Sequence, residues 1–119
     1  MSHPVVLTDG NFQQQVLEAP ELVLVDFGAL WCGPCRVMDP VVDQLAAQYG
    51  SRLKVGKLDC DTEAQTAARF GIRGMPSFLL FRQGQVVDSL TGAMPKSRLA
   101  GRIEVALQAG QPPQRPGSS

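Results

Sequence analysis

The sequence predicts an α/β protein with a mixed sheet of about five strands and four flanking helices, in the order βαβαβαββα. Residues 22–27 form a nearly continuous apolar run, the pattern of a strand covered on both faces of a parallel sheet. A helical pattern follows this run, and another follows the strand candidate at residues 53–58. Residues 77–81 and 86–90, joined by a short polar segment, predict a β-hairpin. Strands that alternate with helices in this way place helices on both faces of the sheet.

The first elements are short. Residues 5–7 predict a strand, and residues 8–11, Thr-Asp-Gly-Asn, supply capping side chains for a helix that extends to about Leu17. Pro20 ends this helix. We expect the apolar strand at residues 22–27 to be central, because it lacks the polar alternation of a strand that faces water.

A longer helix is predicted at about residues 34–49. Pro40 should kink it, since proline removes one backbone hydrogen bond. The apolar residues expected to face the core are Val37, Val41, Val42, Leu45 and Tyr49.

Two further helices are predicted, at about residues 63–70 and 95–109, with a break at Gly71 and Gly74 after the first. Leu99, Ile103 and Leu107 recur every four residues in the second. The chain of 119 residues fits one domain, which we assign to residues 1–110. Residues 111–119 contain three prolines and end in Gly-Ser-Ser, which predicts a disordered tail.

Charge and composition narrow the function. Lysine plus arginine and aspartate plus glutamate each number 11, so the net charge of zero does not favour nucleic acid or an anionic membrane as a partner. Residues 1–4 lack a basic and apolar signal pattern, and no apolar run is long enough to span a membrane. With Met1 as the true start, we expect a cytoplasmic protein, a monomer whose partners are other proteins.

The motif Trp31-Cys32-Gly33-Pro34-Cys35 places two thiols at the expected start of the long helix. Unpaired N–H groups and the helix dipole favour an anion there, so Cys32 should form a thiolate near neutral pH. Cys35, one turn inside, is close enough to form a disulfide with Cys32 but is more sheltered. The alternative is half of a zinc site, but only Cys60 and His3 remain as thiol or imidazole ligands. We therefore favour a redox pair and no metal.

Several separated motifs closely resemble the thioredoxin family. The match covers about residues 5–109 and includes Val25-Asp26-Phe27, Trp31 to Cys35, Pro40, Lys57, Asp59, Asp61, residues 71–74, Met75-Pro76, Gly84 and Gly92. The resemblance implies a thioredoxin fold and a dithiol that reduces protein disulfides, a role in electron transport and cell redox homeostasis. It also implies that a flavin-containing, NADPH-dependent thioredoxin reductase restores the dithiol, so that no bound cofactor is needed.

The resemblance also implies roles for individual residues. Asp26 interrupts an apolar strand, so desolvation should raise its pKa, and it would accept a proton from Cys35. From the sequence alone, Lys57 could form an ion pair with Asp26 or be a solvated strand lysine, and the resemblance favours the ion pair. The bond before Pro76 would be cis. The expected substrate surface consists of Trp31, Gly33, Pro34, Gly74, Met75, Pro76, Gly92 and Ala93, although both Gly74 and Gly92 could simply be turn glycines.

Three residues depart from the family pattern or lie outside it. Gly28 stands where many relatives have a larger side chain, and this should loosen the packing beneath the redox loop. Leu30 makes the rim of the site more apolar. Cys60 is expected to be a small buried apolar residue at a strand end, or else a regulatory thiol open to oxidation, although Asp59 and Asp61 on either side would disfavour its thiolate.

Two alternatives to a disulfide reductase remain open. A binding module with incidental thiols would not need both cysteines and Asp26. An oxidant or isomerase would use the same cysteine pair, but Gly33-Pro34 between the cysteines resembles the reductants.

Overall fold

The computed structural model describes residues 2–110 and contains a five-stranded mixed sheet with the strand order β1-β3-β2-β4-β5. The three strands β1, β3 and β2 are parallel, whereas β4 pairs antiparallel with both β2 and β5. The expected sheet, with the apolar strand at its centre, is therefore confirmed. The strands are β1 (Val5–Leu7), β2 (Leu22–Gly28), β3 (Leu53–Asp59), β4 (Ser77–Arg82) and β5 (Gln85–Thr91). The tail predicted at residues 111–119, and with it the domain boundary, lies outside the described residues.

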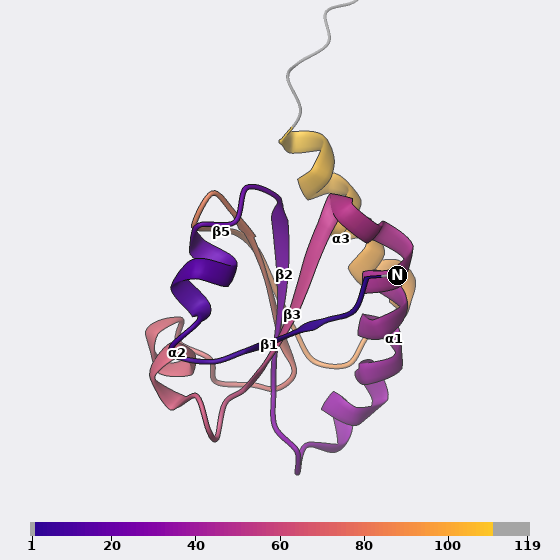
Figure 1. The fold of residues 1–119 in the computed structure, drawn as a ribbon. Coiled ribbons are helices and arrows are strands. Elements are labelled where there is room, and N and C mark those ends of the chain that lie inside the picture. Colours follow the sequence, from indigo (N-terminus) through magenta and orange to yellow (C-terminus); the bar gives the residue numbers. More distant parts are fainter. Residues whose placement is uncertain (1, 111–119) are drawn as a thin grey trace, which may run out of the picture.

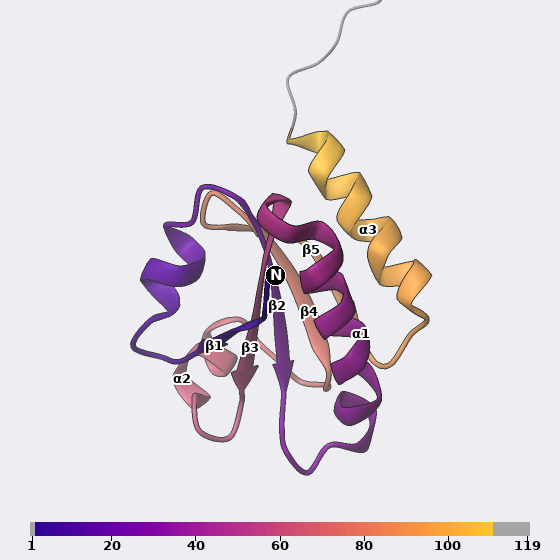
Figure 2. The same cartoon turned by 45° about the vertical axis from the view of Figure 1, so that its right-hand side comes forward.

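Helices cover both faces of this sheet, as expected (Figures 1 and 2). One face packs against α1 (Gly33–Tyr49) and α3 (Lys96–Ala109). The other packs against the short helix η1 (Gln13–Leu17) and the segment around α2 (Ala64–Arg69). A 3₁₀ turn, η2 (Gly50–Arg52), joins α1 to β3. No helix among residues 2–110 combines the length and apolar character needed to cross a membrane.

Strand β2 contributes to both cores because successive side chains of a strand point to opposite faces. Leu22 and Leu24 pack in the core beneath α1 and α3. Val23, Val25 and their neighbours pack in the second core. Asp26 has the same parity as Leu22 and Leu24, so its side chain lies on the face that α1 covers.

The first helix differs from the expectation. It is a five-residue π-helix, Gln13–Leu17, whose N-cap Phe12 has no side-chain cap. Thr8 and Asn11 instead bond each other's backbone, since the Asn11 N–H donates to Thr8 Oγ1 at 3.0 Å and the Thr8 N–H donates to Asn11 Oδ1 at 2.8 Å. These side chains close the turn before the helix rather than capping it.

Helix α1 has the expected position, but its buried face was predicted partly wrongly. Val37 is 64% exposed, and Val41 lies only at the margin of the core. Each four-residue step rotates about 40° around a helix, so a row at this spacing drifts away from the core. Pro40 lies inside the helix, and the expected kink stays a prediction. The buried residues are Cys35, Met38, Val42, Leu45, Ala46 and Tyr49.

The C-terminal elements follow the prediction. A two-residue turn joins β4 to β5, and both of its residues have positive φ, 50° at Gln83 and 81° at Gly84. This is the conformation of a type I′ hairpin turn, whose second position favours glycine. In α3, Leu99 and Ile103 are fully buried and Leu107 packs at the edge of the same core. The hairpin and the last helix are thus confirmed.

Candidate active site

The two cysteines lie where the central strand gives way to a helix, at the carboxyl end of β2. Cys32 is the N-cap of α1 and has extended backbone, and Pro34 stands in the first turn, where no N–H is required. Cys32 Sγ accepts a hydrogen bond from the Cys35 backbone N–H at 3.2 Å. Cys32 therefore lies at a helix N-terminus, as predicted, and such a position favours negative charge on a free cysteine sulfur.

The two sulfurs form a disulfide, and the Cα atoms of the pair are 5.3 Å apart. Both residues are buried, with exposed fractions of 4% for Cys32 and 6% for Cys35. Ala29 and Met75 pack against the disulfide. Within residues 2–110, no group of three or more histidine, cysteine or acidic side chains is arranged to hold a metal ion.

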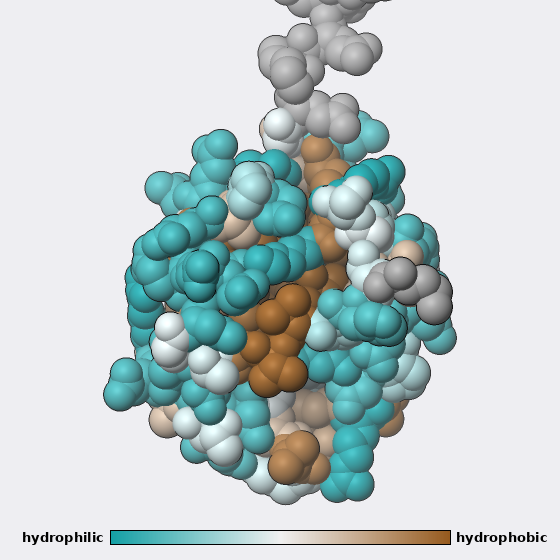
Figure 3. All heavy atoms as spheres, in the orientation of Figure 1, coloured by the Kyte–Doolittle hydropathy of each residue, from teal (hydrophilic) through white to brown (hydrophobic). Residues whose placement is uncertain are grey.

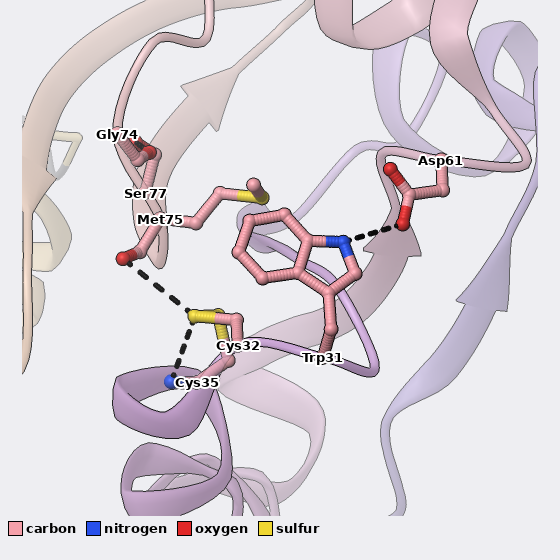
Figure 4. Close-up of a disulfide and its surroundings, with 7 residues drawn as sticks. All are labelled: Trp31, Cys32, Cys35, Asp61, Gly74, Met75 and Ser77. Atoms are coloured by element: carbon pink, nitrogen blue, oxygen red, sulfur yellow. Dashed lines mark hydrogen bonds between the residues drawn. A yellow bond between two sulfur atoms is a disulfide. The ribbon is translucent and has the colours of Figure 1, made fainter.

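A second loop lies against the disulfide. The carbonyl oxygen of Met75 is 3.8 Å from Cys32 Sγ, and the Met75–Pro76 bond is cis, as the resemblance implied (Figure 4). The Gly92 N–H donates to the carbonyl of Pro76 at 2.8 Å, which brings the loop after β5 to the same place. Ala93 is exposed beside it. The structure thus gathers the predicted surface loops around the cysteines.

Trp31 extends from the loop before Cys32 and is 64% exposed. Its Nε1–H donates to Asp61 Oδ2 at 2.7 Å (Figure 4). Sequence reasoning matched Asp61 to the family but assigned it no contact with Trp31. The only available signal was that an indole N–H usually finds an acceptor, which does not say which one.

Asp26 is buried, with 5% of its surface exposed, and within residues 2–110 its Oδ1 has no hydrogen-bond partner. Burial, followed by the negative charge of Asp39, raises the pKa of Asp26 to about 7, while Lys57 acts in the opposite direction. The expectation of a raised pKa is confirmed. Near neutral pH this carboxyl can therefore both hold and release a proton.

Lys57 does not form the expected direct ion pair with Asp26, and that prediction was wrong. Its Nζ lies 3.0 Å from Asp43 Oδ1 and 3.5 Å from Asp39 Oδ1. Burial lowers the pKa of Lys57, but the hydrogen bond that its ammonium donates to Asp43 and the surrounding negative charges outweigh this effect, so the pKa is raised. Asp39 and Asp43 are half exposed, whereas Asp26 is buried, and a charged pair costs less free energy near water than in the interior, so they are the better partners for an ammonium group.

Cys60 is partly buried and packs against the core that contains η1. Burial, followed by the charges of Asp59, Asp61 and Asp26, raises the pKa of its thiol to about 11. The prediction that the flanking aspartates disfavour its thiolate is confirmed.

Comparisons with known proteins agree with this geometry. The family model named Thioredoxin matches residues 3–105. Thioredoxin 1 of Synechococcus elongatus is 46% identical over 107 residues, which cover 90% of this chain and 100% of that protein. Thioredoxins of Pseudomonas aeruginosa and Pyropia yezoensis are 44% and 46% identical, and cover 88% and 82% of this chain and 97% and 91% of their own lengths. The chain therefore belongs to the thioredoxin family, and it is a thiol-disulfide oxidoreductase with the thioredoxin fold and a redox-active Cys32–Cys35 disulfide.

Proposed function

We propose that the reduced protein donates electrons to disulfides of other proteins, with Cys32 as the attacking thiol and Cys35 as the resolving thiol. The hydrogen bond from the Cys35 N–H to Cys32 Sγ carries this assignment, because it stabilises the thiolate of Cys32 in particular. Cys32 attacks one sulfur of the substrate disulfide and the other leaves as a thiolate. Cys35 then attacks Cys32 Sγ, which releases the second substrate thiolate and closes the Cys32–Cys35 disulfide.

Asp26 assists the second step in this proposal. A buried thiol must lose its proton before it can attack, and a carboxyl with a pKa of about 7 is a suitable acceptor at neutral pH. Lys57 acts on Asp26 through its charge rather than through a direct bond.

The substrate chain docks on the surface around Cys32 in this proposal. The exposed indole of Trp31 supplies apolar area, and backbone groups of the loops at Met75 and Gly92 lie next to it. An extended peptide that binds here would bring its disulfide to Cys32. The proposed docking residues are Trp31, Gly33, Pro34, Gly74, Met75, Pro76, Gly92 and Ala93.

We propose that a flavin-containing thioredoxin reductase returns electrons from NADPH to the disulfide. The protein would act as a cytoplasmic monomer and serve electron transport and cell redox homeostasis. Its own domain would comprise residues 1–110.

Reduction of insulin tests the assignment. We expect turnover by the native chain and by Cys60→Ser, and none by Cys32→Ser. Cys35→Ser should accumulate a mixed disulfide with an insulin chain, which mass spectrometry detects, because the resolving thiol is missing. Faster labelling of Cys35 than of Cys32 by iodoacetamide at pH 7 would reverse the two roles.

A further inference from the structure

A cleft of about 460 Å³ opens beside Gly28. This volume lies in the range of roughly 300–1,000 Å³ that is typical of small-molecule sites. The lining includes two highly exposed apolar side chains, Val6 of β1 at 76% and Leu30 of the β2–α1 loop at 83%. Figure 3 shows this face, with one apolar area over β1, a second at the tip of the β2–α1 loop and a hollow between them. The mouth of the cleft therefore offers apolar surface to a ligand.

Gly28 leaves the inner end of this cleft without a side chain. A Cβ atom at this position would stand 3.2 Å from Cys35 Sγ and 3.8 Å from Asp26 Oδ1. Any larger residue would therefore place its side chain over the Asp26 carboxyl. Sequence reasoning expected loose packing beneath the redox loop, and the structure has an open cleft there, which Gly28 itself lines.

The carboxyl at the inner end lacks a hydrogen-bond partner. Asp26 lines the cleft with only 5% of its surface exposed, and its Oδ1 accepts no hydrogen bond from residues 2–110. A buried acceptor without a partner is costly, and a hydrogen bond made to it in the interior is stronger than the same bond in water. The inner end of the cleft therefore favours a ligand that carries N–H or O–H donors.

The charges that line the cleft favour a positively charged ligand. Arg36 and Lys57 are the basic residues of the lining, and the ammonium of Lys57 is already paired with Asp39 and Asp43. Four acidic side chains line the same cleft, so negative charge is in excess and attracts cations. These four residues are Asp26, Asp39, Asp59 and Glu63.

We propose that this cleft binds a small organic cation, a molecule with an apolar body and an amidinium, guanidinium or ammonium group. The apolar body would contact Val6 and Leu30 at the mouth. The N–H groups of the cation would donate hydrogen bonds to the carboxyl of Asp26 at the inner end. Binding is non-covalent and leaves the disulfide intact, so cation binding and the reduction of insulin can fail separately.

Ionisation of Asp26 should control the affinity of this site. The carboxyl is half protonated near pH 7, so a cation should bind more tightly above this pH than below it. The charged side chains that act on Asp26 are Asp39 and Asp43 of α1 and Lys57 of β3. Exposed carboxyl groups and lysines ordinarily titrate outside the interval from pH 5.5 to pH 8.5, and the nearby thiol of Cys60 has a pKa of about 11. Within this interval the change in affinity therefore reports on Asp26.

NMR titration of the disulfide form tests the site with benzamidine, benzamide and benzoate, which share a phenyl ring and differ in charge. At pH 8.5 we expect benzamidine to bind at least about fivefold more tightly than benzamide, the equivalent of roughly 1 kcal/mol, and benzoate to bind more weakly than either. The backbone amide signals of Val6, Gly28 and Leu30 should shift. Equal affinities for benzamidine and benzamide, or shifts confined to the loop at Pro76, would overturn the proposal.

The pH dependence of binding tests the role of Asp26. Benzamidine should bind about fivefold more weakly at pH 5.5 than at pH 8.5, whereas benzamide should bind equally at both. By linkage, saturating benzamidine should lower the pKa of Asp26 below about 7 in carbon-13 NMR spectra. The pH dependence should disappear in Asp26→Asn and remain in Asp43→Asn, because Asp43 is not part of the lining. A native affinity for benzamidine that does not change with pH would overturn the proposal.

Val6→Ser tests the apolar mouth. The change removes apolar surface that the phenyl ring would cover, so the affinities for benzamidine and for benzamide should both fall by about threefold. Val105→Ser, at a position on α3 that is 66% exposed, is the matched control and should change neither affinity. If Val6→Ser does not fold, Leu30→Ser in the exposed loop provides the same measurement. Unchanged affinities in the variant that folds would overturn the proposal.

Discussion

Asp26 and Lys57 are directly opposite each other in the pairing of β2 with β3, yet the Lys57 ammonium is held by other carboxylates. Those carboxylates, Asp39 and Asp43, project from α1. Asp26 Oδ1 keeps no hydrogen-bond partner within residues 2–110. The buried carboxyl therefore retains its proton to a pKa of about 7.

Asp26→Asn should stabilise the fold above pH 7. The carboxyl has a pKa of 3.8 in the unfolded chain and about 7 in the folded protein, so between these values the folded state binds more protons. The contribution of Asp26 to the free energy of unfolding is therefore fully present below pH 4. It decreases as the pH rises to 7 and stays low above that pH. Urea unfolding should show a gain for Asp26→Asn of up to about 4 kcal/mol at pH 8, from a shift of roughly three pKa units, and little gain at pH 4.

The same variant should resolve mixed disulfides more slowly, because the amide of an asparagine side chain cannot take the proton of Cys35.

Asp43→Asn is the matched control for the stability measurement, since the Asp43 carboxyl is more than half exposed. It should show no comparable gain in the free energy of unfolding at pH 8. A gain for Asp26→Asn that is equal at pH 4 and pH 8 would mean that charge burial is not its cause.

Lys57→Gln should raise the pKa of Asp26 above its value of about 7, because the positive charge that lowers this pKa is removed. Carbon-13 NMR of the Asp26 carboxyl measures the titration directly. Lys54→Gln, on the same strand but opposite Val23, should leave it unchanged. A fall in the pKa after Lys57→Gln would contradict the assigned charge effect.

Asp61→Asn should weaken the hydrogen bond that the Trp31 indole donates to residue 61, with little effect on stability. The contact is exposed, so its loss should cost less than about 1 kcal/mol in the free energy of unfolding. Trp31 is the only tryptophan, and its fluorescence should become more accessible to acrylamide. We expect KM for insulin to rise by a few-fold while kcat is retained.

Trp31→Phe provides the control for this contact, because phenylalanine has no N–H to donate. The double variant should raise KM no further than the single variants do. Fully additive effects would show that Asp61 acts on substrates independently of the indole.

Cys60 should resist oxidation and alkylation at neutral pH. Its pKa of about 11 leaves only about one thiol in 10,000 ionised at pH 7, and the thiolate is the reactive form. Iodoacetamide should therefore label Cys32 of the reduced protein at least about 100-fold faster than Cys60. Asp59→Asn should accelerate the labelling of Cys60, because it removes one of the negative charges that raise the pKa of this thiol. Similar labelling rates for Cys32 and Cys60 in the native chain would contradict the raised pKa of Cys60.

The sequence alone determined the order of the strands and helices, the central place of the apolar strand and the position of Cys32 at a helix N-terminus. These features depend on local periodicity and on residues adjacent in the chain. The raised pKa of Asp26 was predictable for the same reason, because a lone carboxyl in an apolar strand is buried with it. The cysteine spacing and the family resemblance together supplied the chemistry.

The tertiary structure decided which carboxylates form ion pairs with Lys57. Lys57 is opposite Asp26 in the sheet, but the packing of α1 on β3 brings the half-exposed carboxylates of Asp39 and Asp43 closer to its ammonium than the carboxylate of Asp26. The same packing set the exposure of Val37, since the orientation of a helix on a sheet cannot be read from its apolar spacing alone. A cleft beside Gly28 is likewise formed by segments distant in the chain, from β1, β3 and α1, which only the tertiary structure brings together.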